Sequence, residues 1–146
     1  MSPIRSFDHV GITVADLDAA VAFFLKLGLE LEGRTFLEGE FLDTVVGLSD
    51  ARTEMAMLRA PGGGAGLELA TFIRPEHQPG SPGAMSTELG LRSVAFVVDD
   101  VRAIVEQLAA DGYGLVGGVG DYESTWRMAS VRGPEGIIVS LAQRID

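Results

Sequence analysis

The sequence contains no cysteine. This absence excludes disulfide bonds, a thiolate nucleophile, and zinc or iron–sulfur sites held by cysteine. Any metal ion would have to be bound by histidine and carboxylate side chains, and the chain has only two histidines.

Basic residues and long apolar runs are scarce as well. The 11 Lys and Arg residues are outnumbered by 21 Asp and Glu residues, which gives a formal net charge of −10. Such a charge repels nucleic acid and anionic membrane surfaces, so we expect neither as a partner. No stretch approaches the ~20 apolar residues of a membrane-spanning helix. The first residues also lack the apolar segment of a secretory signal, so we expect a cytoplasmic protein.

The chain contains an internal repeat. Residues 8–17 align with residues 92–101, so that an alternating apolar pattern and a following aspartate recur together. Later segments match at a shorter spacing, which implies a difference in loop length: residues 54–59 match 127–132, and 66–69 match 138–141. Two copies of one structural unit explain three matches in the same order.

Each half has the periodicities of a strand, a helix and three further strands. Residues 7–14 alternate as in a strand with one buried face. Asp16 is a suitable N-cap for a helix that ends near Gly28, and Asp99 or Asp100 begins the equivalent helix that ends near Gly112. The remaining strands are expected near residues 30–37, 53–59 and 66–73, and again near 113–120, 125–132 and 136–142. The prediction is an α+β fold of two tandem βαβββ modules.

We expect a single domain over residues 1–146, a length near the commonest domain size. The first module would cover residues 1–74 and the second residues 90–146. Between them, residues 75–89 begin with a segment rich in Pro and Gly that cannot sustain a helix or a central strand. This segment is predicted to be an exposed linker loop.

The segment from Asp8 to Val14, followed by Asp16 and Leu17, resembles the vicinal oxygen chelate superfamily, which includes glyoxalases, bleomycin-resistance proteins and extradiol dioxygenases. The turn at residues 133–136, before the last strand, supports the resemblance. It implies that the two sheets curve into a cup-shaped mixed β-sheet with helices outside, which binds a small molecule. Members often form homodimers, in which the cup is closed within one chain or by exchange of modules. One scaffold hosts many chemistries, so the reaction does not follow from it.

The resemblance also implies four metal-ligand positions, which are His9, Glu68, Ser93 and Ser140. Only the first two can be conventional ligands, whereas metal-binding members usually carry His and Glu at the last two. A site of His9 and Glu68 suits one divalent ion such as zinc, nickel, manganese or iron(II), but two protein ligands rarely suffice. His77 in the linker is a conceivable third ligand, although a solvated loop histidine is the simpler interpretation. The alternative is a metal-free pair that holds a polar group of the substrate or acts as acid and base.

Strand alternation places small residues beside His9, Glu68, Ser93 and Ser140, which suggests an open cavity. A cup filled by other strands or by a partner subunit is the alternative. Five residues are candidates for substrate binding: Ser93 and Ser140, and further Tyr122, Arg127 and Glu54. A Glu54–Arg127 salt bridge competes with this role, because the two occupy equivalent positions of the modules. Trp126 is interpreted as a packing residue and Arg132 as a surface residue.

Two functions remain open. One is a lyase or isomerase of the glyoxalase or epimerase kind, in which His9 and Glu68 are catalytic and move a proton next to a carbonyl. The other is a metal-free binding protein that sequesters its ligand, as bleomycin-resistance proteins do. The serines at positions 93 and 140 favour the second function, and the retained His9 and Glu68 favour the first.

Overall fold

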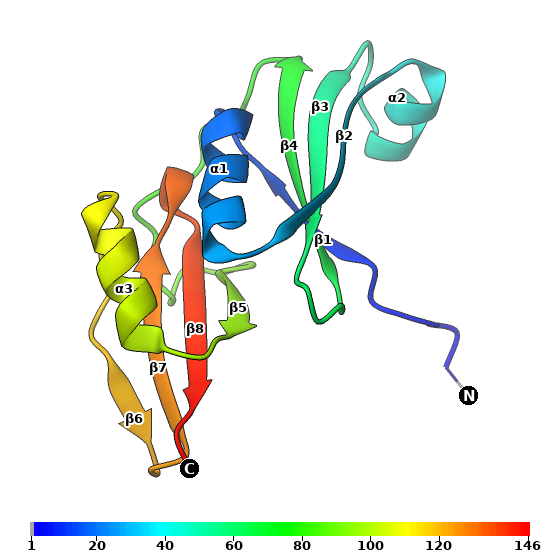
Figure 1. Cartoon of the computed structure of the whole chain (residues 1–146). Coiled ribbons are helices and arrows are strands. Elements are labelled where there is room, and N and C mark those ends of the chain that lie inside the picture. Colours follow the sequence, from blue (N-terminus) through cyan, green and yellow to red (C-terminus); the bar gives the residue numbers. More distant parts are fainter. Residues whose placement is uncertain (1) are drawn as a thin grey trace. The chain divides into compact units, whose positions relative to one another are not determined.

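A computed structural model describes residues 2–146 (Figure 1). The chain divides into two compact units after Pro79, inside the predicted linker. Each unit contains a four-stranded mixed sheet, which confirms the predicted α+β class and the tandem modules. No helix within residues 2–146 has the length and apolar character needed to cross a bilayer.

The first unit contains four strands and two helices. In chain order they are β1 (His9–Thr13), α1 (Leu17–Leu27), β2 (Glu30–Glu38), α2 (Glu40–Val46), β3 (Arg52–Arg59) and β4 (Gly66–Arg74). The sheet order is β1-β4-β3-β2, in which β1 and β4 are parallel and the other pairs are antiparallel. Helix α1 packs against β3 and β4 on one face of this sheet.

The second unit repeats this topology without an equivalent of α2. Its elements are β5 (Ser93–Val97), α3 (Val101–Ala110), β6 (Gly120–Tyr122), β7 (Trp126–Arg132), a short 3₁₀ turn η1 (Pro134–Gly136) and β8 (Ile138–Arg144). The sheet order is β5-β8-β7-β6, with β5 parallel to β8. Helix α3 packs against β7 and β8.

The two longer helices begin where the sequence predicts. The Asp16 carboxylate accepts the backbone N–H of Ala19, and the Asp100 carboxylate accepts that of Ala103. These contacts satisfy N–H groups that the first turn of a helix leaves unpaired. Gly28 ends α1 at a φ of 122°, a conformation that few other residues adopt.

Alternation along the strands separates a core face from an open face in each sheet. On the core face of the first sheet lie the side chains packed beneath α1, among them Ala56, Leu58, Leu67 and Leu69, all buried. Val131, Val139 and Leu141 are their buried counterparts beneath α3. Burial of this apolar surface supplies the main favourable free energy of folding in both modules.

Two features of the fold differ from the sequence prediction. Helix α2 was not predicted, because its seven residues are too few to show a helical period; glycines stand at both of its caps. The strand expected over residues 113–120 is instead the three-residue β6 at 120–122, preceded by a single bridge between Leu115 and Val131. Glycines at 114, 117 and 118 favour turns over a continuous strand here.

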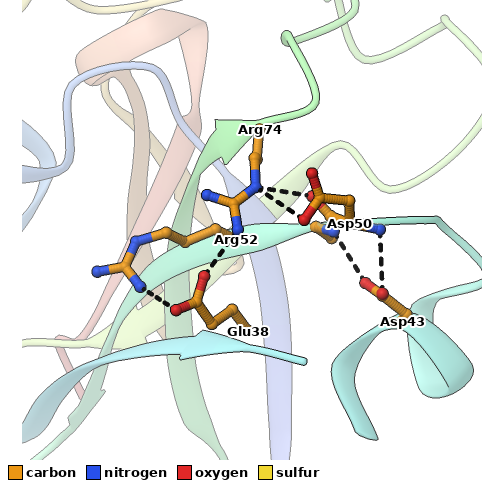
Figure 2. A network of polar contacts seen from close by, with 6 residues as sticks. Glu38, Asp43, Asp50, Arg52 and Arg74 are labelled. Atoms are coloured by element: carbon orange, nitrogen blue, oxygen red, sulfur yellow. Dashed lines mark hydrogen bonds and ion pairs between the residues drawn. The ribbon is translucent and has the colours of Figure 1, made fainter. Parts of the chain in front are cut away.

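A polar network holds α2 and the neighbouring strand ends together (Figure 2). Glu38 on β2 forms ion pairs with Arg52 (2.9 Å) and Arg74 (2.7 Å), and these contacts lower the pKa of its carboxyl group. Asp43 on α2 accepts the backbone N–H groups of Asp50 and Ala51, at 3.0 and 2.8 Å. The network fixes how the chain leaves α2 and enters β3.

Candidate functional site

His9 and Glu68 lie in contact on the open face of the first sheet. In the parallel pair of β1 and β4, His9 is opposite Gly66 and Gly11 is opposite Glu68, so His9 and Glu68 are diagonal neighbours on one face. The His9 Nε2 atom lies 3.1 Å from the Glu68 Oε2 atom. Their side chains are 36% and 21% exposed, so both are accessible to a small molecule.

Asp8 extends this pair on the other side of the imidazole. Its Oδ2 atom lies 2.6 Å from His9 Nδ1, so both ring nitrogens of His9 face carboxylate oxygens. The hydrogen bond from His9 lowers the pKa of Asp8. The sequence interpretation missed Asp8, although an aspartate directly before a candidate catalytic histidine was a usable signal.

The surroundings of the pair combine small residues with methionine. Met57 on β3 is opposite Glu68, and Met55 is opposite Ala70, so both methionines share the face of His9. A side chain built at Gly66 would meet Met57 Sδ at 2.9 Å and the Arg59 guanidinium at 3.1 Å, which shows that both side chains lie over this glycine. Methionine adapts to irregular ligand shapes, so this face combines an adjustable apolar surface with one polar pair.

The equivalent positions of the second module carry Ser93 and Ser140. Register confirms the equivalence, since Ser93 is opposite Ile138 and Ala95 is opposite Ser140. The Ser140 hydroxyl lies 2.8 Å from the hydroxyl of Ser130, its neighbour on β7. Ser93 is exposed at the start of β5.

Glu54 and Arg127 lie on the helix-facing sides of their sheets, opposite to the faces of Glu68 and Ser140. Glu54 forms an ion pair with Arg34 (2.8 Å), and Arg34 also binds Asp18 at the start of α1 (2.5 Å). These two contacts raise the pKa of Arg34 above its ordinary value. The three residues line a depression of about 440 Å³ together with Ala15, Asp16, Leu17 and Thr71.

Arg127 is bound by a carboxylate of its own module. It binds Asp121 through two parallel hydrogen bonds of 2.9 and 3.1 Å, which raise the pKa of Arg127 and lower that of Asp121. Glu54 and Arg127 are therefore each paired within their own module. Their role in substrate binding stays a prediction.

Tyr122 lies on the same face as Ser140 and is 61% exposed. Trp126, its partner across β6 and β7, is half-buried, and the Arg144 guanidinium lies 5.3 Å from the indole centroid. Trp126 was interpreted as packing, yet it shares the open face with Tyr122. Arg132, interpreted as a surface residue, is half-buried and donates to the backbone oxygens of Pro82, Ala84 and Gly136.

The comparison with known families decides the membership of this chain. The sequence profile of the Glyoxalase/Bleomycin resistance protein/Dioxygenase superfamily matches residues 6–141. The chain belongs to this superfamily. A solved glyoxalase family protein from Bacillus cereus is 37% identical, with 99% of this chain and 97% of that chain covered and a TM-score of 0.95.

Solved structures of lower identity share the fold. A glyoxalase/dioxygenase from Nostoc punctiforme is 21% identical, with 100% of this chain and 97% of that chain covered and a TM-score of 0.67. TnmS3, an antibiotic binding protein from Streptomyces sp. CB03234, is also 21% identical, with 99% of each chain covered and a TM-score of 0.65. At this identity the likeness shows the fold alone. No curated protein matches the sequence.

The donor set does not fit the divalent metal ion that many superfamily members bind. Within residues 2–146 no three His, Cys, Asp or Glu side chains come together as a metal-binding group. The second module offers two neutral hydroxyls, Ser93 and Ser140, where imidazole and carboxylate would be needed.

His77 was the conceivable third ligand, and its imidazole already has a partner in the first unit. Its Nε2 atom accepts the backbone N–H of Phe72 at 3.0 Å and lies 3.5 Å from the Thr71 hydroxyl. This side chain therefore ties the segment after β4 to the end of that strand. It is not the freely solvated loop histidine of the simpler interpretation.

Proposed function

We propose that this protein binds a small carbonyl compound on the open face of its first sheet and moves a proton next to the carbonyl group, without a metal ion. The observation that carries the proposal is the 3.1 Å contact between His9 Nε2 and Glu68 Oε2 on an accessible face. A proton between an imidazole and a carboxylate can pass to either side, which is what general acid–base chemistry requires.

The roles of Glu68 and His9 follow from the protons that a carboxylate and an imidazole can accept and donate. Glu68, the less exposed of the two, would take the proton from the carbon next to the carbonyl, and His9, once protonated at Nε2, would donate a hydrogen bond from this atom to the oxygen that becomes negative. Met55 and Met57 would pack against the carbon skeleton of the ligand. The neighbouring Arg59 already binds Glu32 and the Gly64 carbonyl, so this face favours a neutral ligand over an anionic one.

The test is hydrogen–deuterium exchange at the carbon next to the carbonyl. Hydroxyacetone and pyruvate serve as neutral and anionic probes, and proton NMR in deuterium oxide follows the loss of signal. We expect exchange of hydroxyacetone to exceed the buffer rate, and Glu68→Gln to reduce this excess by about 100-fold or more. Glu106→Gln, the same substitution at an exposed residue of α3, is the matched control and should leave the rate unchanged.

Metal dependence is tested on the same samples. Exchange should persist in a chelator, and added zinc, nickel or manganese should not raise the melting temperature. A rate abolished by the chelator and restored by one of these ions would overturn the metal-free mechanism.

Ligand sequestration without turnover is the second candidate. The Ser130–Ser140 hydroxyl contact favours it, because the second module then offers hydrogen-bonding groups rather than charged ones. Equilibrium dialysis with full recovery of unaltered ligand, and no exchange above the Glu68→Gln rate, would support sequestration over catalysis.

We also propose that the protein acts as a homodimer. Large apolar side chains are highly exposed on the single chain, including Phe41 on α2 and Leu89 and Leu91 before β5. Exposed apolar surface of this kind favours association. Light scattering after size-exclusion chromatography should give twice the 15.4 kDa of one chain; the mass of a single chain at micromolar concentration would contradict the dimer.

A further inference from the structure

We propose that Asp8 is a positioning residue that keeps the Nδ1–H of His9 in place, which leaves Nε2 as the nitrogen through which this imidazole exchanges protons. This inference rests on the proposed function, because it identifies the reactive atom of the His9–Glu68 pair. It adds a residue to the site that neither the superfamily membership nor the sequence motif assigns.

The contact distances favour Asp8 over Glu68 as the acceptor of the single N–H of the neutral imidazole. A neutral imidazole carries a single N–H, and here a carboxylate oxygen faces each nitrogen. The Asp8 contact at 2.6 Å is slightly shorter than a usual charge-assisted hydrogen bond, whereas the Glu68 contact at 3.1 Å is longer than such bonds usually are. The hydrogen bond at one ring nitrogen sets the tautomer, so the proton belongs on Nδ1.

The second module shows that the fold does not need this contact. Arg92 occupies the position equivalent to Asp8, and Ser93 occupies that of His9. Arg92 forms an ion pair with Glu88, four residues earlier in the chain. An acidic residue before β1 is therefore a feature of the His9 site rather than a requirement of the βαβββ module.

The consequence is a defined direction for proton transfer. With Nδ1–H bound to Asp8, the neutral ring has its lone pair on Nε2, directed toward Glu68, and a proton taken up by the pair enters between these two atoms. A ligand that donates a hydrogen bond to this face meets Nε2 as its acceptor. Without Asp8, the neutral ring would place its N–H on Nε2 and donate it to Glu68, so the acceptor would be lost.

The tautomer is measured directly by nitrogen NMR of protein labelled with ¹⁵N-histidine. The chain has two histidines, so the spectrum contains two rings, and a His77→Gln variant assigns them. Spectra are recorded at roughly pH 9, well above the ordinary histidine pKa of about 6.5. His77 serves as the internal reference, because its Nε2 accepts the Phe72 N–H and its proton must be on Nδ1.

We expect wild-type His9 to show a protonated Nδ1 and an unprotonated Nε2, and Asp8→Ala to reverse this assignment. Glu106→Ala removes one carboxylate from the surface of α3 and should leave the wild-type pattern. Unchanged His77 signals in Asp8→Ala show that the first module has kept its structure. An unprotonated Nδ1 in the wild type, or the same His9 tautomer in Asp8→Ala, would overturn the proposal.

The measured tautomer of His9 does not depend on whether the protein catalyses proton exchange. If the tautomer follows Asp8 but no carbonyl probe exchanges its protons, the proposed function fails and the positioning role stands. If exchange depends on Glu68 but the tautomer ignores Asp8, the positioning role fails alone.

Discussion

Gly136 offers a quantitative test of how the second module is built. It follows Pro134 and Glu135 in the turn before β8 and has a φ of +84°. A side chain at this position would place its Cβ 2.1 Å from the carbonyl oxygen of Pro82, a contact no real Cβ atom tolerates. We therefore expect Gly136→Ala to displace the segment that contains Pro82.

The expected loss of stability in Gly136→Ala has two parts, and a matched variant, Gly112→Ala, separates them. Gly112 has a similar φ of +92° with no atom within 4 Å of the position that a Cβ would take, so Gly112→Ala incurs backbone strain alone, about 1–2 kcal/mol. Gly136→Ala incurs the same strain and also disturbs the hydrogen bonds from Arg132 to Pro82 and Ala84, both 2.9 Å. A hydrogen bond to a charged group contributes about 1.5–3 kcal/mol. We expect Gly136→Ala to lower the free energy of unfolding by about 2 kcal/mol more than Gly112→Ala does.

Urea denaturation measures both variants under the same conditions. The contribution of the Arg132 contacts is isolated by Arg132→Met alone and in combination with Gly136→Ala. Because both changes affect the hydrogen bonds from Arg132 to Pro82 and Ala84, the double variant should lose less stability than the two single variants added together. Equal losses for Gly136→Ala and Gly112→Ala, within about 0.5 kcal/mol, would refute the argument.

Two further predictions concern local polar contacts. Asp16→Ala and Asp100→Ala each remove the carboxylate that caps a helix, so each should lower the free energy of unfolding by about 1 kcal/mol, whereas the asparagine variants should stay near wild type in urea denaturation. The pair of Asp121 and Arg127 should stabilise the protein at neutral pH and lose this effect in acid. Because the pKa of Asp121 is lowered in the folded state, the contribution is present above its ordinary pKa of about 3.9 and is lost as the pH falls through the folded value. The difference in stability between the wild type and Asp121→Asn should thus be constant from pH 7 to about pH 5 and shrink below about pH 4; a difference that grows in acid would contradict this sign.

The strands and helices that were predicted correctly show a regular hydrophobic pattern or a capping residue in the local sequence. The alternation of residues 7–14 and the caps at Asp16 and Asp100 led to the observed strand and helices. Helix α2 was missed because a seven-residue segment is shorter than the window in which a helical period is visible. The strand predicted over 113–120 was wrong because glycines interrupt a pattern that otherwise resembles a strand.

The placement of the candidate site residues was predictable where it follows from alternation along one strand. It was not predictable where it follows from the register between strands. His9 and Glu68 each belong to a strand whose alternation was clear, and the repeat placed both strands in the same module. Glu54 and Arg127 were chosen as equivalent residues, which is correct, but the side of the sheet that they face follows from how β3 pairs with β4 and β7 with β8. A shift by one residue moves every side chain of a strand to the other face. The central part of β3 is apolar on both faces, so its own pattern does not show which face is buried.

Local sequence alone determined the two βαβββ modules, the capped helices and the absence of cysteine chemistry, because these properties depend on neighbours along the chain. The tertiary structure decided which partner other charged groups take: Arg34 for Glu54, Asp121 for Arg127, and backbone carbonyls for Arg132. Such pairings depend on distances of a few ångströms between segments whose approach is set by strand register and loop path. Composition and periodicity carry no information about these distances.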